Sequence, residues 1–285
     1  MSVRIGTRAS KLALTQTQQT ADQLAAVGGF PVELVHVRTD GDVLKGSLSQ
    51  MGGTGVFVAA LRDALLQNTC DIAVHSLKDL PTGPALGLSL AATPKRVDVR
   101  DVLCARDGLK LADLPSGASV GTGSPRRAAQ LRAVRPDLDI RDIRGNVDTR
   151  LGRVPGLSGN TNDAVVDGKS NDLDAVVLAA AGLHRIGRLD AVSEYLETDI
   201  MLPAAGQGAL AIECRTADAP RRAGSTEGSQ GVLAQALAAL DDPDTRLAVT
   251  AERALLARLE AGCAAPVGAY AYRKGSMLHL EAVAF

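Results

Sequence analysis

The sequence predicts an α/β fold of two lobes with mixed sheets, followed by a smaller α+β segment. Strand-like apolar runs alternate with runs of helical spacing over the first part of the chain, and the alternation restarts after residues 95–101. From about Gly228 the pattern changes to one long helix and a pair of strands. Two successive α/β units of about 100 residues each suit lobes that face one another across a cleft, a common place for ligands.

In the first unit, the first helix has clear signals at both ends. Ser10 can cap its start, and the pair Gly28 and Gly29 ends it after Val27. Residues 70–76 form a short, nearly continuous apolar run, typical of a strand covered on both faces. The elements expected here are strands at 3–6, 32–39 and 70–76 and helices at 10–27 and 56–68.

The second unit repeats the alternation, with helix starts at Ser124 and Asn146. Its expected elements are strands at 102–107, 118–122 and 138–143, a helix at 124–134, a helix start at 146–154, and at 173–187 a strand leading into a turn. Residues 155–171 and 221–231 are rich in Gly, Asn, Asp and Ser, which predicts flexible insertions.

In the last segment, Asp242 caps a helix with Pro243 at its first position, and the helix is expected to end at Gly262. Strands at 268–273 and 277–285 follow it. Without further elements, this segment would leave a helix face and a sheet edge uncovered.

Composition indicates a globular protein that is nearly neutral overall, so its arginine clusters are local features. Hydrophobic residues make up 46% and charged residues 22% of the 285, and 31 Lys and Arg against 32 Asp and Glu give a net charge of -1. Aromatic residues are 2% and Trp is absent, which argues against a nucleic-acid partner. No run resembles a signal peptide or is long enough to span a bilayer, so the expectation is a cytoplasmic protein without a membrane partner.

The cysteines are expected to be reduced thiols without a metal. None has C-x-x-C spacing, which argues against zinc. Cys70, Cys104 and Cys214 lie in or beside apolar strand patterns, where buried packing explains them. Cys263 differs because it follows a helix and a glycine in a loop, where its thiol could project outward. A helix C-terminus would not lower its pKa, and a loop cysteine with no role is a competing interpretation.

Arginines cluster where strands turn into helices. Arg126 and Arg127 follow the Ser124 cap directly, beside the positive end of a helix. The same arrangement recurs where Arg144 and Arg150 flank Asn146, and where Arg8 precedes Ser10. Surface salt bridges would be the structural alternative. Three such turns, and the planar fork of arginine, instead favour a ligand with several carboxylates or phosphates.

One acidic residue stands among these cations. The strand ending near Val74 delivers His75, Ser76, Lys78 and Asp79 to the carboxyl edge of the sheet, where open α/β folds bind ligands. A lone carboxylate there could stabilise a cationic intermediate or transfer a proton. The alternative is that Lys78 and Asp79 form a solvated loop pair while His75 packs in the core.

Taken together, these runs resemble the porphobilinogen deaminase (hydroxymethylbilane synthase) family of tetrapyrrole, and so porphyrin and haem, biosynthesis. The matching segments occur in the family's order and cover nearly the whole chain to about Val267: RIGTRASKLAL, GGTGVF, DIAVHSLKDLP, GTGSPRRAAQL, RGNVDTR, AGLHRIGR, LPAAGQGALAIECR and TAERALLARLEAGCAAPVG.

The resemblance implies a monomeric transferase that joins four porphobilinogen molecules head to tail onto a covalent dipyrromethane and releases hydroxymethylbilane. It implies that Cys263 is the attachment point and Asp79 the catalytic carboxylate, which assists loss of ammonia and stabilises a cationic azafulvene. The residues implied to hold acetate and propionate groups are Arg8, Ser10, Ser76, Lys78, Thr122, Ser124, Arg126, Arg127, Arg144, Arg150 and Arg185. Groups from both lobes would then converge on one cleft around Asp79.

The family's organisation implies two lobes like those of periplasmic binding proteins and a third domain that carries the cofactor cysteine. The boundaries expected are 1–97 with 203–218 for the first lobe, 98–202 for the second and 228–285 for the third, with Gln207 near a hinge. The third domain normally continues beyond Phe285, so the chain looks truncated. Two further departures are Thr54, where some members have lysine, and the long insertion at 155–171.

Two other functions stay open from the sequence. A two-lobed protein that binds a polyanion without chemistry would use the same arginines but leave Asp79 and Cys263 idle. A truncated relative could also have kept the pattern and lost the activity.

Overall fold

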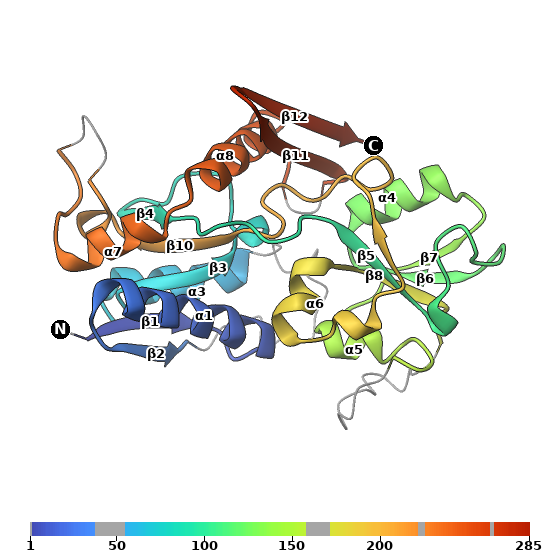
Figure 1. The fold of residues 1–285 in the computed structure, drawn as a ribbon, viewed down its shortest axis with the longest axis horizontal. Coiled ribbons are helices and arrows are strands. Elements are labelled where there is room, and N and C mark those ends of the chain that lie inside the picture. Colours follow the sequence, from blue (N-terminus) through green and yellow to red (C-terminus); the bar gives the residue numbers. More distant parts are fainter. Residues whose placement is uncertain (1, 38–54, 158–171, 222–225, 263–264) are drawn as a thin grey trace. The chain divides into compact units, whose positions relative to one another are not determined.

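The computed structural model describes residues 2–37, 55–157, 172–221, 226–262 and 265–285 (Figure 1). They divide into two compact units, each with its own sheet and core. Unit 1 comprises Met1–Val97, Ala209–Cys263 and Ala271–Leu280, and unit 2 comprises Asp98–Gly208, Ala264–Tyr270 and Glu281–Phe285. The three-domain boundaries expected from the sequence stay a prediction.

Unit 1 is built on a mixed five-stranded sheet of order β2-β1-β3-β10-β4. The strand β1 runs parallel to both β2 and β3, whereas β10 runs antiparallel to β3 and β4. The strands are β1 (Val3–Thr7), β2 (Val32–His36), β3 (Ile72–Ser76), β4 (Leu88–Ala92) and β10 (Leu210–Arg215). The helices are α1 (Lys11–Gly28), α3 (Gly55–Leu66), α7 (Val232–Leu240) and α8 (Pro243–Arg258).

Helices cover both faces of this sheet. Leu24 of α1 and Leu237 of α7 are fully buried in one cluster with Ile72 of β3. On the opposite side, Leu61 and Leu65 of α3 pack in a second cluster. Strand β3 is therefore apolar at nearly every position because both of its faces are buried, as the sequence predicted.

Unit 2 contains a second mixed five-stranded sheet, of order β7-β6-β8-β5-β9. In this sheet β6 is parallel to β7 and β8, and β5 is antiparallel to β8 and β9. The strands are β5 (Asp101–Ala105), β6 (Ser119–Gly121), β7 (Asp139–Arg141), β8 (Ala175–Ala179) and β9 (Glu194–Leu196). The helices are α4 (Pro125–Val134), α5 (Val147–Leu151) and α6 (Ala180–Ile186).

Alternate residues of β5 enter separate cores on the two faces of the unit 2 sheet. Leu103 packs with Leu131 of α4, whereas Val102 packs with Leu151 of α5 and Leu183 of α6. The two mixed sheets, covered by helices, confirm the predicted α/β class.

All four helix starts predicted from capping residues are confirmed. The side chains of Ser10, Ser124, Asn146 and Asp242 each accept a hydrogen bond from the backbone three residues on. Helix α8 ends at Arg258, earlier than the predicted Gly262. The backbone of Glu260 is left-handed, with φ of 52°, and cannot continue an α-helix.

The turn predicted at the end of residues 173–187 is wrong, because the chain forms helix α6 there. The helix begins without a side-chain cap, contains Gly182, and has weak local signals. Leu183 is fully buried against β8 residues, so tertiary packing stabilises the helix. Strands β4 and β9 and helix α7 were also not predicted; β9 has only 3 residues.

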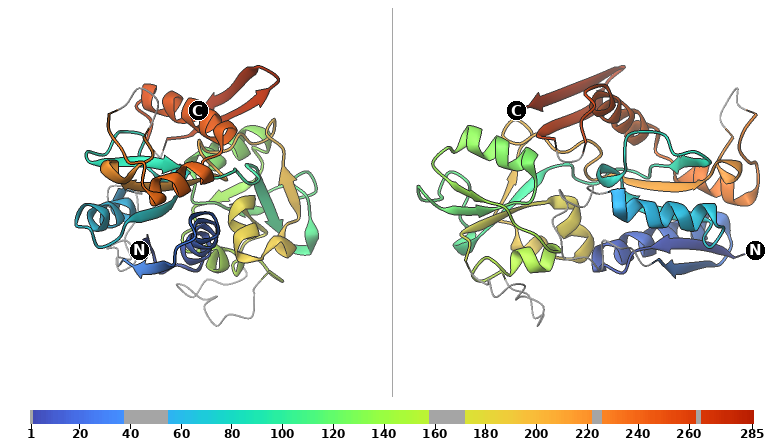
Figure 2. Two further views of the ribbon diagram at one scale, coloured as in Figure 1. Left: turned by 60° about the vertical axis from the view of Figure 1, so that its left-hand side comes forward. Right: turned by 180° about the vertical axis from the view of Figure 1, so that it is seen from behind.

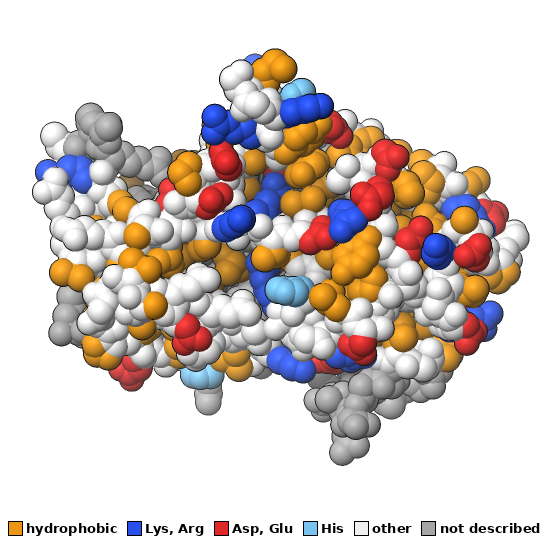
Figure 3. Space-filling model, in the orientation of Figure 1, with side chains coloured by type: hydrophobic (Ala, Val, Ile, Leu, Met, Phe, Trp, Pro, Cys, Tyr) orange, Lys and Arg blue, Asp and Glu red, His pale blue; other side chains and the backbone are white. Residues whose placement is uncertain are grey.

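The last two strands, β11 (Val267–Lys274) and β12 (Met277–Ala284), form the predicted hairpin with a turn at Gly275. In both views of Figure 2 this hairpin lies beside α8, and the backbone N–H of Ala271 donates to Glu252 of that helix at 2.8 Å. Hydrophobic side chains reach the surface along β12 (Figure 3), including Met277 and Leu280. Among the described residues, no helix combines the length and apolarity that crossing a membrane requires.

Candidate active site

In unit 1, the carboxyl ends of the parallel neighbours β1 and β3 bring predicted site residues to one edge of the sheet. Arg8 and Ser10 follow β1, whereas Ser76, Lys78 and Asp79 close or follow β3. All five are half-buried. The hydroxyl of Ser10 caps α1, and that of Ser76 exchanges hydrogen bonds of 3.2 and 3.3 Å with Gln16 of the same helix.

Asp79 closes a single turn of 3₁₀ helix, η1 (Leu77–Asp79). This candidate catalytic turn, Leu77–Leu80, is held by its backbone: Leu77 N–H donates to the carbonyl of Ala209 at 3.1 Å, and Leu80 N–H donates to the carbonyl of Leu77 at 3.1 Å. The Asp79 carboxylate makes no hydrogen bond or ion pair with any other residue that the structure describes. A half-buried carboxylate that has no partner in the described part of the chain, at an edge that also carries Arg8 and Lys78, suits a ligand that becomes positively charged.

His75 is buried one position before Ser76 and contacts Glu213 of β10. The Nε2 atom of His75 lies 3.1 Å from Oε2 of Glu213, and Arg62 of α3 donates to both Glu213 oxygens at 3.1 and 2.8 Å. Burial alone would raise the pKa of Glu213, but the contacts from His75 and Arg62 outweigh it and lower the pKa to about 2. His75 is therefore buried, as the alternative interpretation of the sequence predicted, and it contacts the buried carboxylate of Glu213.

Acid should destabilise unit 1 through Glu213. Its folded pKa is depressed from 4.5 to about 2, so its stabilising contribution is complete above about pH 4.5 and is lost as the pH falls towards 2. The shift corresponds to about 3 kcal/mol. Measured from about pH 7 to about pH 3, the difference in free energy of unfolding between wild type and Glu213→Gln should shrink. A difference that stays constant over this range would contradict the assignment.

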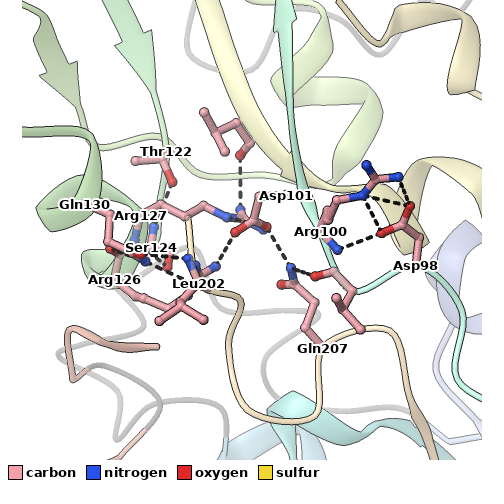
Figure 4. A network of polar contacts seen from close by, with 12 residues as sticks. Asp98, Arg100, Asp101, Thr122, Ser124, Arg126, Arg127, Gln130, Leu202 and Gln207 are labelled. Atoms are coloured by element: carbon pink, nitrogen blue, oxygen red, sulfur yellow. Dashed lines mark hydrogen bonds and ion pairs between the residues drawn. The ribbon is translucent and has the colours of Figure 1, made fainter. Parts of the chain in front are cut away.

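In unit 2, predicted site residues gather around a buried carboxylate that the sequence analysis missed (Figure 4). Asp101 begins β5 and is fully buried. Arg126 donates to its Oδ2 at 2.7 Å, and Arg127 donates to its Oδ1 at 3.0 and 2.7 Å. Gln207 adds a bond of 2.8 Å to the same Oδ1. Burial opposes the charge, but the two guanidinium groups outweigh it and hold the pKa of Asp101 well below its usual range.

The two arginines are therefore internal rather than on the surface. Arg126 is 3% exposed and Arg127 is 5% exposed. Each also donates from a second guanidinium nitrogen to a backbone carbonyl, Arg126 to that of Leu202 and Arg127 to that of Val177. Two guanidinium charges against one carboxylate leave a net positive charge. The Nε atom of Arg126 is buried and has no hydrogen-bond partner among the described residues. The available signal for Asp101 was an acidic residue at the head of an otherwise apolar strand.

The remaining predicted residues of unit 2 are less concentrated. Thr122 is buried, and its hydroxyl accepts from Ser124 N–H at 3.2 Å. Arg144 is exposed and lies 3.4 Å from Asp142, whereas Arg150 is half-buried in α5.

Arg185 of α6 differs from the paired arginines. It is half-buried and donates to the carbonyl of Gly208 at 2.9 Å, and no acidic side chain in the described part of the chain pairs with it. Burial lowers the pKa of Arg185 to about 10, so it stays charged at neutral pH. A cation of this kind fits an anionic ligand.

Several sequence predictions concern residues outside those described: Cys263, Thr54, positions 158–171 and 222–225 of the two insertions, and positions 38–39 of the second strand. Cys70, Cys104 and Cys214 are buried free thiols, as predicted. Burial raises the pKa of both Cys104 and Cys214 to about 12, which makes them poor nucleophiles.

Two family models match the sequence. The model described as "Porphobilinogen deaminase, dipyromethane cofactor binding domain" matches residues 3–223, and the model "Porphobilinogen deaminase, C-terminal domain" matches residues 246–284.

Relatives agree with these matches. A porphobilinogen deaminase from Leifsonia xyli is 57% identical over 284 residues, which cover 100% of this chain and 80% of the relative. One from Cutibacterium acnes is 59% identical over 273 residues, covering 96% and 78%. A solved periplasmic substrate-binding protein from Coxiella burnetii matches with a TM-score of 0.48 and 14% identity, over 88% of this chain and 96% of its own.

The matches confirm the predicted transferase class and the dipyrromethane cofactor. By its domain matches and its relatives, the chain belongs to the porphobilinogen deaminase family.

Proposed function

We propose that Asp79 is the catalytic carboxylate of this enzyme and that Cys263 carries its dipyrromethane through a thioether. The enzyme deaminates porphobilinogen, joins four molecules head to tail and releases hydroxymethylbilane. The observation that supports Asp79 most is its half-buried carboxylate, which has no partner among the described residues and lies at the sheet edge that carries Arg8 and Lys78.

The role of Asp79 follows from the charge that develops in the reaction. Loss of ammonia leaves positive charge on the pyrrole, and a fixed carboxylate stabilises that charge more strongly than reorienting water would. The same carboxylate can accept or return a proton at the pyrrole nitrogen or at the leaving amine. The backbone hydrogen bonds of the turn hold Asp79 in place and leave its carboxylate oxygens available to the substrate.

The carboxylates of the cofactor and of the growing chain need cations and hydroxyl donors. We assign this role in unit 1 to Arg8, Ser10, Ser76 and Lys78, and in unit 2 to Thr122, Ser124, Arg126, Arg127, Arg144, Arg150 and Arg185. Two features fit such a ligand. Arg185 lacks an acidic partner among the described residues, and the Nε of Arg126 has no hydrogen-bond partner among them. When bound, the dipyrromethane supplies the acceptor for each pyrrole at high effective concentration.

The cellular location, the oligomeric state and the partners of the protein are also proposals. By resemblance to the family, the protein is a cytoplasmic monomer that acts on a small molecule without a membrane partner. The near-neutral charge and the few aromatic residues argue against a nucleic-acid partner.

Mass spectrometry of the purified chain tests this function. We expect an adduct of dipyrromethane size on the peptide that contains Cys263, and none on Cys70, Cys104 or Cys214, whose thiols are buried. Cys263→Ser should carry no adduct and should consume no porphobilinogen in a colorimetric assay. Turnover by a chain with an unmodified Cys263 would contradict the attachment site, and an intact adduct without turnover would favour an inactive binder.

A further inference from the structure

The carbonyls of the two residues that follow Asp79 are held by a side chain from a distant helix. Arg253 of α8 donates from one guanidinium nitrogen to the carbonyl of Leu80 at 2.8 Å and from the other to the carbonyl of Pro81 at 2.7 Å. The planar fork of arginine can bind two neighbouring acceptors at once, which a lysine ammonium cannot do in a fixed geometry. One residue therefore fixes the downstream end of the catalytic turn.

The same face of α8 also packs against this turn. Val249 lies one helical turn before Arg253, so both point to the same side. Val249 is 1% exposed and shares an apolar cluster with Leu77 and Leu80, which flank the two half-buried positions of the turn. The catalytic turn is thus supported by α8 through an apolar contact and a charged one.

Helix α8 is itself firmly anchored within unit 1. Near its start, Arg246 contacts Asp241 and donates to the carbonyls of Leu90 and Ala91. In its middle, the fully buried Glu252 accepts from Arg96 at 2.6 and 3.1 Å. Because α8 is held at several points, it can keep the turn that it contacts in a fixed position.

We propose that Arg253 is a positioning residue for the reaction: its guanidinium fixes the two carbonyls after Asp79 and so holds the Asp79 carboxylate in its working position. Because that carboxylate has no partner of its own among the described residues, its placement depends on the backbone of the turn. This inference rests on the proposed catalytic role of Asp79.

The test compares Arg253→Met with Arg246→Met as a matched control. Both variants remove a guanidinium of α8 that binds two backbone carbonyls, but only Arg253 reaches the catalytic turn. We expect Arg253→Met to lower kcat roughly 10- to 100-fold, with little change in KM, because a small misplacement of a catalytic group has this effect. Arg246→Met should lower the melting temperature and leave kcat of the folded enzyme near the wild-type value.

A second readout does not depend on turnover. The amide of Leu80 donates to Leu77 within the catalytic turn, and its hydrogen exchange should become faster in Arg253→Met but not in Arg246→Met. Arg253→Lys, which keeps the charge and loses the fork, should fall between wild type and Arg253→Met in both measurements. It also serves as the test if Arg253→Met does not fold.

The outcomes separate this inference from the proposed function. A wild-type kcat in the Arg253 variants, equal losses of kcat in the Arg246 control, or unchanged exchange at Leu80 would overturn the positioning role. Asp79→Asn is measured alongside. If it keeps its turnover, the catalytic assignment fails; if it is inactive while Arg253→Met is fully active, only the positioning role fails.

Discussion

Replacing Asp79 with asparagine is expected to lower kcat by about 10²- to 10⁴-fold, the usual contribution of a positioned acid–base group. Asparagine has nearly the same size but carries no charge and cannot exchange a proton. Positive charge that develops on the pyrrole would then meet a neutral amide. The fold should survive, because the Asp79 side chain makes no hydrogen bond or ion pair with the other described residues.

The measurement is steady-state consumption of porphobilinogen, with circular dichroism to verify the fold. Asp63→Asn is the matched control, since Asp63 is an exposed acid on α3 of the same unit. Asp79→Glu should keep part of the activity, because it retains the charge at a shifted position. Wild-type turnover in Asp79→Asn would exclude Asp79 as the catalytic group.

Replacing Asp101 with asparagine should destabilise unit 2 by about 3–5 kcal/mol, as expected when one partner of a buried ion pair is removed. The guanidinium groups of Arg126 and Arg127 would stay buried with their shared negative charge gone. A single amide oxygen cannot replace two carboxylate oxygens that accept from both arginines and from Gln207. The loss should appear in the denaturant midpoint and the melting temperature.

Asp139→Asn is the control for this effect. Asp139 pairs with Arg141 at 2.7 Å in the same unit, but the two side chains are 49% and 47% exposed. Exposed pairs of this kind contribute at most about 1 kcal/mol, so this variant should change stability little. Equal losses in the two variants would mean that the Asp101 cluster does not stabilise unit 2 as its burial indicates.

The predictions that succeeded depended on local signals. A capping residue such as Ser124 or Asp242 acts on amides three residues away, so the sequence around it contains the whole interaction. The apolar run of β3 likewise reflects burial on both faces. Helix α6 was missed because its stability comes from packing against β8 and from no capping side chain of its own.

The candidate site shows the same division. Position after a strand end predicted that Asp79, Lys78 and Arg8 lie at one edge of the sheet, because parallel neighbours end at the same edge, and the structure places them there. Their roles as site residues stay a prediction. The pairing of Arg126 and Arg127 with a carboxylate was not visible, since Asp101 lies 25 and 26 residues earlier in the chain. Many carboxylates lie at comparable separations, and only the folded chain selects one of them.

By itself, the sequence determined the α/β class, the helix starts, and the family through an ordered set of motifs. Only the tertiary structure decided that Asp101 forms ion pairs with two of the predicted anion-binding arginines. It also decided that Arg253 donates to the carbonyls of Leu80 and Pro81, which lie 173 and 172 residues away in the chain. The physical reason is range: capping and periodicity act within a few residues, whereas ion pairs and packing depend on which distant segments the fold brings together.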